Sequence, residues 1–143
     1  MAVVITIPNH LKFMFATKKV DMENDAFKII LMNAAFAFDK DTHATLADVT
    51  SNQIATANGY TQNNKALAGV SVVENDTLDK CTCIWSDVTW TAAGGNIGPV
   101  GAAIIYDDST ADDTVVCCID FGEDLTTLDG FSFIIQAPEI DIA

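Results

Sequence analysis

Short apolar runs separated by turn-forming residues are the main pattern along the chain. A run of strand length recurs about every 10–18 residues, with Gly, Asn and Asp in between, which is the spacing typical of an all-β sandwich or barrel. The predicted strands are 27–32, 67–73, 81–90, 102–106, 115–121 and 131–135. We therefore expect an all-β fold, namely a single-domain antiparallel β-sandwich, jelly-roll or immunoglobulin-like, with about seven or eight strands.

Helical signals are confined to two short segments. Residues 10–19 follow Pro8, and residues 44–54 follow Asp41 and Thr42, either of which is a suitable N-cap. Neither segment has a long apolar stripe, so at most short helices are expected. No internal repeat or linker divides the sequence, and residues 1–143 are predicted to form one domain.

Composition and charge narrow the class of protein. Half of the residues are hydrophobic, and 20 acids against seven lysines give a net charge of −13. Enough apolar surface is present to exclude intrinsic disorder. All seven lysines lie before residue 81, whereas residues 81–143 hold eleven acids and no base. Such a chain repels nucleic acid, so no nucleic-acid partner is expected, and the acidic half favours solvent, cations or a basic partner.

Neither a membrane span nor a signal peptide is predicted. The uncharged apolar stretches are shorter than the roughly 18 residues that a spanning helix needs. The apolar run at residues 2–7 has no basic residues before it and stops at Pro8. We therefore expect no membrane partner and no export by this route.

The four cysteines are Cys81, Cys83, Cys117 and Cys118. Their spacing fits neither a zinc ribbon nor a thioredoxin-like motif. On strands, Cys81 and Cys83 would share a face, whereas Cys117 and Cys118 would point to opposite faces. We expect reduced, buried cysteines that bind no metal and form no disulfide needed for folding.

The sequence contains few residues suited to catalysis. The two histidines, His10 and His43, lie in different neighbourhoods, and none of the common hydrolase, metalloprotease or phosphate-binding motifs is present. Residues 94–98 are glycine-rich but lack the helix and acidic residue of a nucleotide-binding loop, so a flexible loop is expected there. We predict no catalytic residue, no enzymatic activity and no cofactor.

One acidic turn is a weak candidate for a cation site. Asp107, Asp108, Asp112 and Asp113 lie between two predicted strands, and carboxylates gathered on a short turn are suitable ligands for Ca²⁺. The glycine and glutamate of an EF-hand loop are absent at the required positions. The alternative is a polar hairpin loop whose Asp and Ser side chains bond their own backbone, and no metal is predicted.

Three aromatic residues leave a second alternative open. If Tyr60, Trp85 and Trp90 were exposed, they would form a stacking platform for a carbohydrate or receptor. The other interpretation is core packing, which the strand-like run around both tryptophans favours.

Several short segments resemble a family of small tailed-bacteriophage virion proteins. They keep their order over roughly residues 26–136, and none of them is a catalytic signature. The segments are 27–33, 39–43, 48–50, 58–61, 87–90, 98–99, 103–108, 119–122 and 131–135.

This resemblance implies a virion component encoded near the major capsid protein. The expected function is that of a non-enzymatic decoration or cement protein, which stabilises the head by bridging major capsid protein subunits. Dimers or trimers on the capsid surface are expected, with synthesis in the bacterial host cytoplasm. The alternatives are a neck or tail protein and a receptor- or carbohydrate-binding β-module of the virion.

The N-terminal segment is the one basic part of the chain. Residues 1–20 hold three lysines and no acid. We expect residues 1–25 to form an arm or short helix that contacts the capsid or an adjacent copy, with the acidic turn 107–113 facing solvent. The alternative is that residues 3–7 form an edge strand and that Phe13 and Phe15 belong to the core. The predicted contact residues are Leu11, Lys12, Phe13, Phe15, Lys18 and Lys19.

Overall fold

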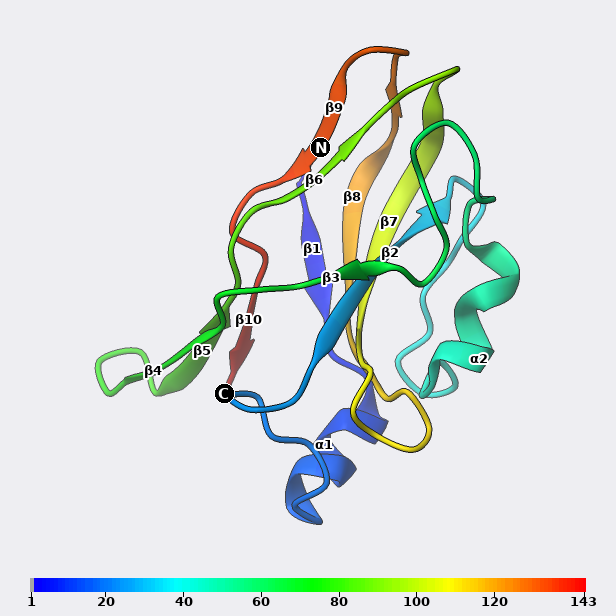
Figure 1. The fold of residues 1–143 in the computed structure, drawn as a ribbon. Helices are drawn as coiled ribbons and strands as arrows, with labels where there is room; N and C mark the ends of the chain where they lie inside the picture. The colour runs from blue at the N-terminus through cyan, green and yellow to red at the C-terminus, as the bar shows by residue number, and fades with distance from the viewer. Residues whose placement is uncertain (1) are drawn as a thin grey trace.

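Strands form most of the regular structure (Figure 1). The computed structural model describes residues 2–143, which contain ten strands, two short α-helices and one 3₁₀ turn. The helices are α1 (Asn9–Ala16) and α2 (Leu46–Val49), and the 3₁₀ turn η1 (Thr50–Asn52) follows α2. The strands are β1 (Val4–Thr6), β2 (Phe27–Asn33), β3 (Lys65–Ala66), β4 (Ser71–Asn75), β5 (Lys80–Ile84), β6 (Val88–Thr91), β7 (Ile97–Asp107), β8 (Val115–Thr127), β9 (Ser132–Ile135) and β10 (Glu139–Ile142).

The strands form one large sheet and two small ones. The large sheet has the order β1-β8-β7-β2-β3, and the small sheets have the orders β10-β5-β4 and β6-β9. All neighbouring strands are antiparallel. The predicted all-β, sandwich-like class with only short helices is confirmed, although ten strands are present where seven or eight were expected.

The main core lies between the large sheet and the two small ones. Side chains such as Leu31, Ile105 and Ile119 on the large sheet share one buried cluster with Trp90 and Ile140 from the small sheets. Cys83 and Cys117 also belong to this cluster. Burial of this much apolar surface is the main stabilising contribution to such a fold.

The large sheet is buried on its second face as well. Ile30, Ile104 and Cys118 lie in a separate cluster, covered by the segment between β2 and β3 through residues such as Phe36 and Val49. Burial on both faces explains why the run at 27–32 is almost continuously apolar instead of alternating. Cys117 and Cys118 therefore face opposite sides of the sheet, as expected.

Several predicted strands have different ends in the structure. The run 81–90 contains two strands, β5 and β6, because the chain passes from one small sheet to the other within it. At this crossing the Trp85 amide donates to the Pro138 carbonyl, and the Ser86 amide donates to the Ala68 carbonyl. The strand predicted at 67–73 lies at Ser71–Asn75, and β3 and β10 were not predicted. Helix α2 is capped by Thr45, in a capping box with Asp48, and not by Thr42 or Asp41.

The N-terminal segment belongs to the body of the fold. β1 pairs with β8, with Ile5 opposite Ile119, so residues 4–6 form an edge strand as the alternative interpretation proposed. After α1, Val20 and Met22 are also buried. The segment is therefore not an arm lying outside the sandwich.

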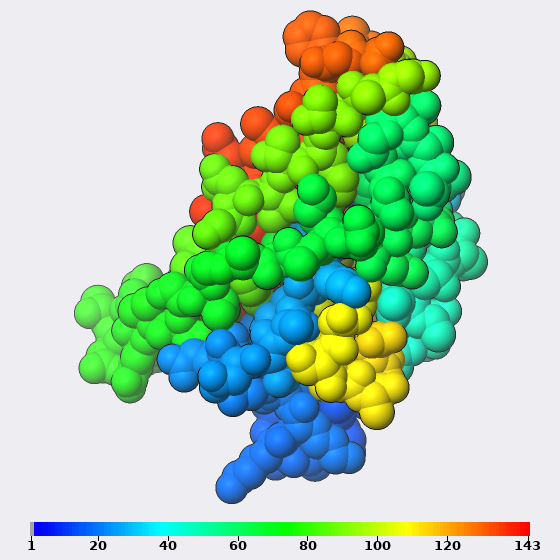
Figure 2. Space-filling model, in the orientation of Figure 1, coloured from blue at the N-terminus to red at the C-terminus, as the bar shows by residue number. Residues whose placement is uncertain are grey.

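Two elements project from the body of the molecule. Figure 2 shows α1 at one end, in blue, and the β4–β5 hairpin projecting to one side, in green. The turn between β8 and β9 forms the opposite end (Figure 1).

Candidate functional site

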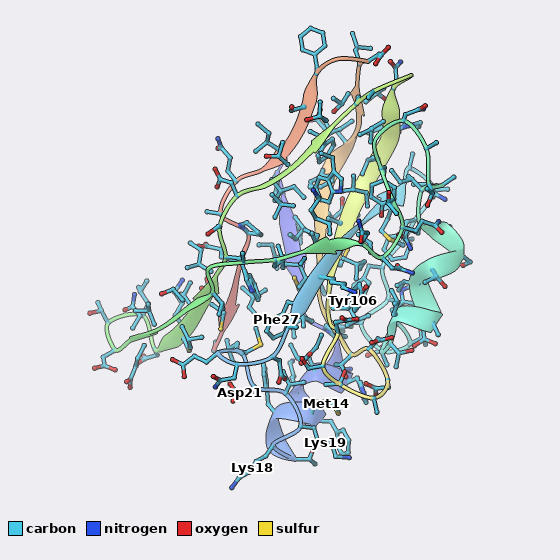
Figure 3. All side chains as sticks on the ribbon, in the orientation of Figure 1. Met14, Lys18, Lys19, Asp21, Phe27 and Tyr106 are labelled. Atoms are coloured by element: carbon cyan, nitrogen blue, oxygen red, sulfur yellow. The ribbon has the colours of Figure 1, made fainter. Side chains whose placement is uncertain are left out.

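Helix α1 presents an apolar and basic surface on a rigid base. Leu11 and Met14 are buried in the main core and fix the helix to the sheets, whereas Phe13 remains 54% exposed. Thr17 is the C-cap of the helix, and its hydroxyl donates a hydrogen bond to the Phe13 carbonyl. Lys18 and Lys19 follow directly, and both are exposed (Figure 3). We call Phe13, Lys18 and Lys19 the α1 patch.

The structure separates the predicted contact residues into three groups. Leu11 has no exposed surface, so this residue is a core position and the expectation that it contacts a partner is wrong. Phe15 is half-buried and packs against the main core. Lys12 is exposed, but it borders a different groove, beside β1. Phe13, Lys18 and Lys19 remain as an accessible group.

A groove of about 470 Å³ lies between α1 and the β7–β8 loop. His10 spans it: its Nε2 lies 3.0 Å from Asp112 Oδ2, and its ring stacks on Phe13 with 5.9 Å between centroids. Burial opposes ionisation of Asp112, but hydrogen bonds from Thr114 and His10 lower its pKa. The pair therefore fixes the helix to the acidic turn.

The same groove contains Ser109, but its hydroxyl is not arranged as a nucleophile. Ser109 Oγ accepts a hydrogen bond from the Ala26 amide at 2.8 Å, and His10 directs its Nε2 to Asp112. A nucleophilic serine requires a base within hydrogen-bond reach of its hydroxyl. In the described part of the chain, His10, Asp112 and Ser109 do not have the geometry of a catalytic triad.

The four carboxylates of the acidic turn do not converge. Asp108 lies 3.1 Å from Lys28, and Asp112 pairs with His10. Asp107 is fully buried, which contradicts the expectation that the whole turn faces solvent. Burial also raises the pKa of Asp113. Residues 2–143 contain no group of three or more His, Cys, Asp or Glu side chains placed to hold a metal ion.

The three aromatic residues of the carbohydrate-binding alternative are all in the core. Tyr60, Trp85 and Trp90 are almost completely buried. The Tyr60 hydroxyl donates to Gln53 Oε1 at 2.8 Å and accepts from the Leu31 amide at 3.0 Å. These residues form no exposed stacking platform, and the interpretation of both tryptophans as core residues is confirmed.

The cysteines are free thiols, three of them buried. Cys81 and Cys83 pack on the same side of β5, as the strand period predicts. Burial raises the pKa of Cys83 and of Cys118 to about 12. Because the thiolate is the reactive form, these buried cysteines are poor nucleophiles.

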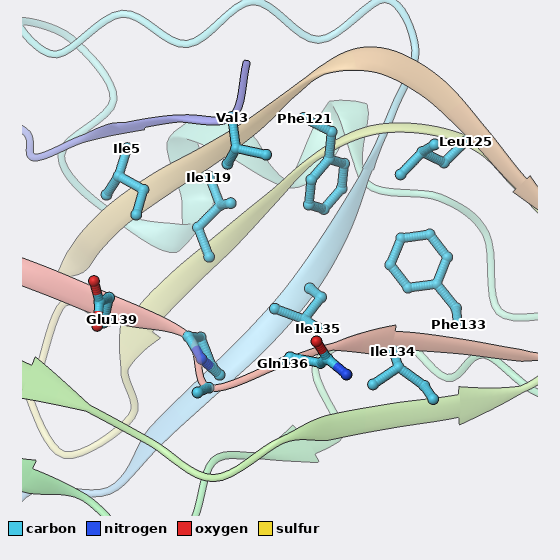
Figure 4. A pocket seen from close by; sticks show the side chains of 12 residues that line it. Val3, Ile5, Ile119, Phe121, Leu125, Phe133, Ile134, Ile135, Gln136 and Glu139 are labelled. Atoms are coloured by element: carbon cyan, nitrogen blue, oxygen red, sulfur yellow. The ribbon is translucent and has the colours of Figure 1, made fainter. Parts of the chain in front are cut away.

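A second apolar surface lies at the free side of β1, and sequence reasoning missed it. Val3 and Ile5 line a groove of about 410 Å³ together with β8 and β9 side chains that include Phe121, Phe133 and Ile134 (Figure 4). We call it the β1 groove. Its residues come from opposite ends of the sequence, so no local motif indicates it. The one local signal is an N-terminal strand without any charged residue.

Several exposed apolar side chains belong to the strands that border this groove and to the segment that leads into β9. Among residues 2–143, six of the nine large exposed hydrophobic residues belong to β1 and its preceding residue or to the segment from the β8–β9 turn into β9: Val3, Val4, Ile5, Leu128, Phe131 and Ile134. Monomeric soluble proteins rarely expose large contiguous apolar patches, so such a patch is typical of a protein–protein contact surface.

Comparison of the chain with protein-family models, with curated proteins and with solved structures found no match. None of the helices within residues 2–143 is long and apolar enough to cross a membrane. The geometry itself offers two apolar surfaces on rigid elements. Such an arrangement is suited to binding another macromolecule.

Proposed function

We propose that the chain is a non-enzymatic structural protein of a tailed-bacteriophage virion, which decorates the capsid by binding across major capsid protein subunits. The proposal starts from the family resemblance over roughly residues 26–136. The structural observation that supports it most is the α1 patch, an exposed phenylalanine with two lysines on a protein of net charge −13. The working surface is then a binding interface and not a catalytic centre.

The α1 patch is suited to an acidic and partly apolar docking surface. Lys18 and Lys19 attract carboxylates that the rest of the molecule repels, and Phe13 supplies an aromatic anchor of the kind that dominates binding energy. Leu11 and Met14 hold the helix in place, so docking costs little conformational entropy. On a symmetric shell, contacts repeated between neighbours strengthen a modest affinity.

Decoration stabilises the shell by mass action. A protein that binds the assembled lattice but not free capsid subunits shifts the equilibrium towards the lattice. The function therefore needs no cofactor, nucleic acid or membrane, and its location is the capsid surface.

The test is co-sedimentation with capsids that lack the protein. Wild type is expected to bind with saturable stoichiometry, and F13A combined with K19E is expected to reduce the affinity about tenfold or more. L78A combined with K40E is the matched control, because it truncates an exposed apolar side chain and reverses the charge of an exposed lysine outside both apolar surfaces. Raising the salt concentration is expected to weaken wild-type binding, because exposed charges are screened.

Copy number in purified virions separates a head decoration or tail-tube protein from a neck or tail-tip protein. Quantitative mass spectrometry is expected to give hundreds of copies, whereas a neck or tail-tip protein follows the local symmetry with about six or twelve. Absence of the protein from virions, or wild type that does not bind capsids, would contradict the proposal.

A further inference from the structure

β1 is an edge strand without the usual protection. It lies at the end of the order β1-β8-β7-β2-β3, and no strand within residues 2–143 pairs with its other edge. Natural edge strands usually carry charges, prolines or bulges that prevent pairing with another chain. Residues 2–7 contain no charge and no proline, and Val3, Val4 and Ile5 are 58%, 56% and 41% exposed. This edge is therefore open to a further strand.

Two cavities follow one another along the free edge of β1. The β1 groove lies beside Val3 and Ile5, and a second cavity of about 380 Å³ lies beside Ile5, Thr6 and Ile7. Ile5 lines both cavities, so they follow one another along the strand. Their far side is formed by residues of β9 and β10 and the segment between them. An added strand would bury these residues together with the unpaired backbone of β1.

The charges beside β1 differ at its two ends. β8 is antiparallel to β1, and Asp120 lies opposite Val4. From Asp120, β8 continues past the N-terminal end of β1 to the exposed residues Glu123 and Asp124. Glu139 lines the β1 groove at the same end. Lys12 borders the second cavity, where Asp141 is already paired with Lys80 at 2.6 Å.

These charges are free to pair with another molecule. Lys12, Glu123 and Glu139 make no ion pair within residues 2–143. The edge therefore has a negative end and a positive end. Parallel pairing of two copies would place like charges together, whereas antiparallel pairing places Lys12 of each copy towards the acidic end of the other.

We propose that a second copy of this chain occupies the β1 edge. Two β1 strands pair antiparallel across a two-fold axis and join the two five-stranded sheets into one continuous sheet. This interface is isologous and closed, and it leaves neither β1 edge exposed. The inference does not depend on capsid binding, and its readout is the mass of the isolated protein in solution.

Light scattering after size-exclusion chromatography tests the proposal directly. Wild type is expected to have the mass of two 15.3 kDa chains. V4K is expected to be monomeric, because a lysine on each copy puts two like charges into the paired edge, whereas its own fold tolerates a lysine opposite Asp120. V73K is the matched control, because Val73 is a strand residue of similar exposure, 53%, on β4. Circular dichroism and thermal melting verify that both variants fold.

A charge-reversal cycle tests the antiparallel orientation and does not depend on V4K. K12E and E123K are each expected to raise the dimer dissociation constant about fivefold to tenfold. The double variant K12E/E123K is expected to return close to wild type, because each reversed charge again faces its opposite. A wild-type monomer or trimer, a dimer that V4K leaves intact, or a double variant weaker than both single variants would overturn the proposal.

Discussion

Asp107 is buried beside Asp25, and the two carboxyl groups share a hydrogen bond only when one of them holds a proton. Asp107 Oδ1 accepts a bond from the Ser109 amide at 2.8 Å, whereas Oδ2 has no partner among the described residues when both groups are ionised. Burial, and then the bond with Asp25, raises the pKa of Asp107 to about 7. The end of β7 therefore holds a carboxyl group that titrates near neutral pH.

This pair predicts that stability falls as the pH rises. The pKa of Asp107 is higher in the folded than in the unfolded chain, so its contribution is complete below pH about 4 and is lost as the pH passes about 7. D107N removes the titrating group and keeps a donor for Asp25. We expect wild type to lose about 1–3 kcal/mol of unfolding free energy between pH 5 and pH 8, and D107N to lose clearly less.

Urea denaturation at several pH values measures this difference. D76N is the control, because Asp76 is an exposed turn residue of the β4–β5 hairpin, and this variant is expected to follow wild type. An identical pH dependence in D107N and wild type would show that Asp107 ionises normally in the fold.

The two hydrogen bonds of the buried Tyr60 hydroxyl predict that Y60F, which keeps the aromatic ring, is less stable than wild type. Y60F leaves the Leu31 amide and Gln53 Oε1 without their buried partner. We expect the unfolding free energy to fall by about 1–3 kcal/mol. Y106F is the comparison, because the Tyr106 hydroxyl makes no hydrogen bond to a described residue, and its loss is expected to be smaller. Thermal or chemical denaturation measures the unfolding free energy of both variants. Equal losses of unfolding free energy in Y60F and Y106F would contradict the stabilising role of the Tyr60 hydrogen bonds.

The strands were predictable where the burial of one or both faces produces an alternating or continuous apolar pattern in the sequence. The apolar run around Ile29 and Ile30 and the alternation around Cys83 both follow from which faces of the strand are covered. The boundaries were less predictable, because they depend on remote partners. The Ser86 amide, just beyond the end of β5, bonds the Ala68 carbonyl. The strand β10 forms because Ile140 pairs with Cys83.

The candidate site was predictable only in part. A basic, apolar N-terminal segment is visible in the sequence, but which of its residues are exposed depends on how α1 rests on the sheets. Leu11 and Phe13 are both apolar and two residues apart, and the helical period places them on different sides. The β1 groove joins Ile5 to Ile134, a pairing that no sequence pattern contains.

The capping box at α2 predicts a measurable contribution to stability from the segment that covers the second face of the large sheet. Asp48 accepts hydrogen bonds from the Ala44 and Thr45 amides and from the Thr45 hydroxyl. The Thr45 amide in particular lowers the pKa of Asp48. We expect D48A to lose about 0.5–2 kcal/mol of unfolding free energy at neutral pH. The loss is expected to shrink in acid, where the carboxylate of wild type becomes protonated as well; a loss independent of pH would contradict this account.

Leu11 and Phe13 provide the sharpest test of how the N-terminal segment is built. Leu11 is fully buried in the main core, so L11A removes apolar contacts and leaves a cavity, at an expected cost of about 2–5 kcal/mol of unfolding free energy. Phe13 is 54% exposed and stacks on His10, so F13A is expected to change stability by no more than about 0.5 kcal/mol. Urea denaturation of the two variants under identical conditions measures both values. M14A serves as a second core position on the same helix and is expected to behave like L11A. If L11A and M14A were as stable as wild type, the helix would not be held by the core, and the α1 patch would lose the rigid base on which its proposed docking role depends.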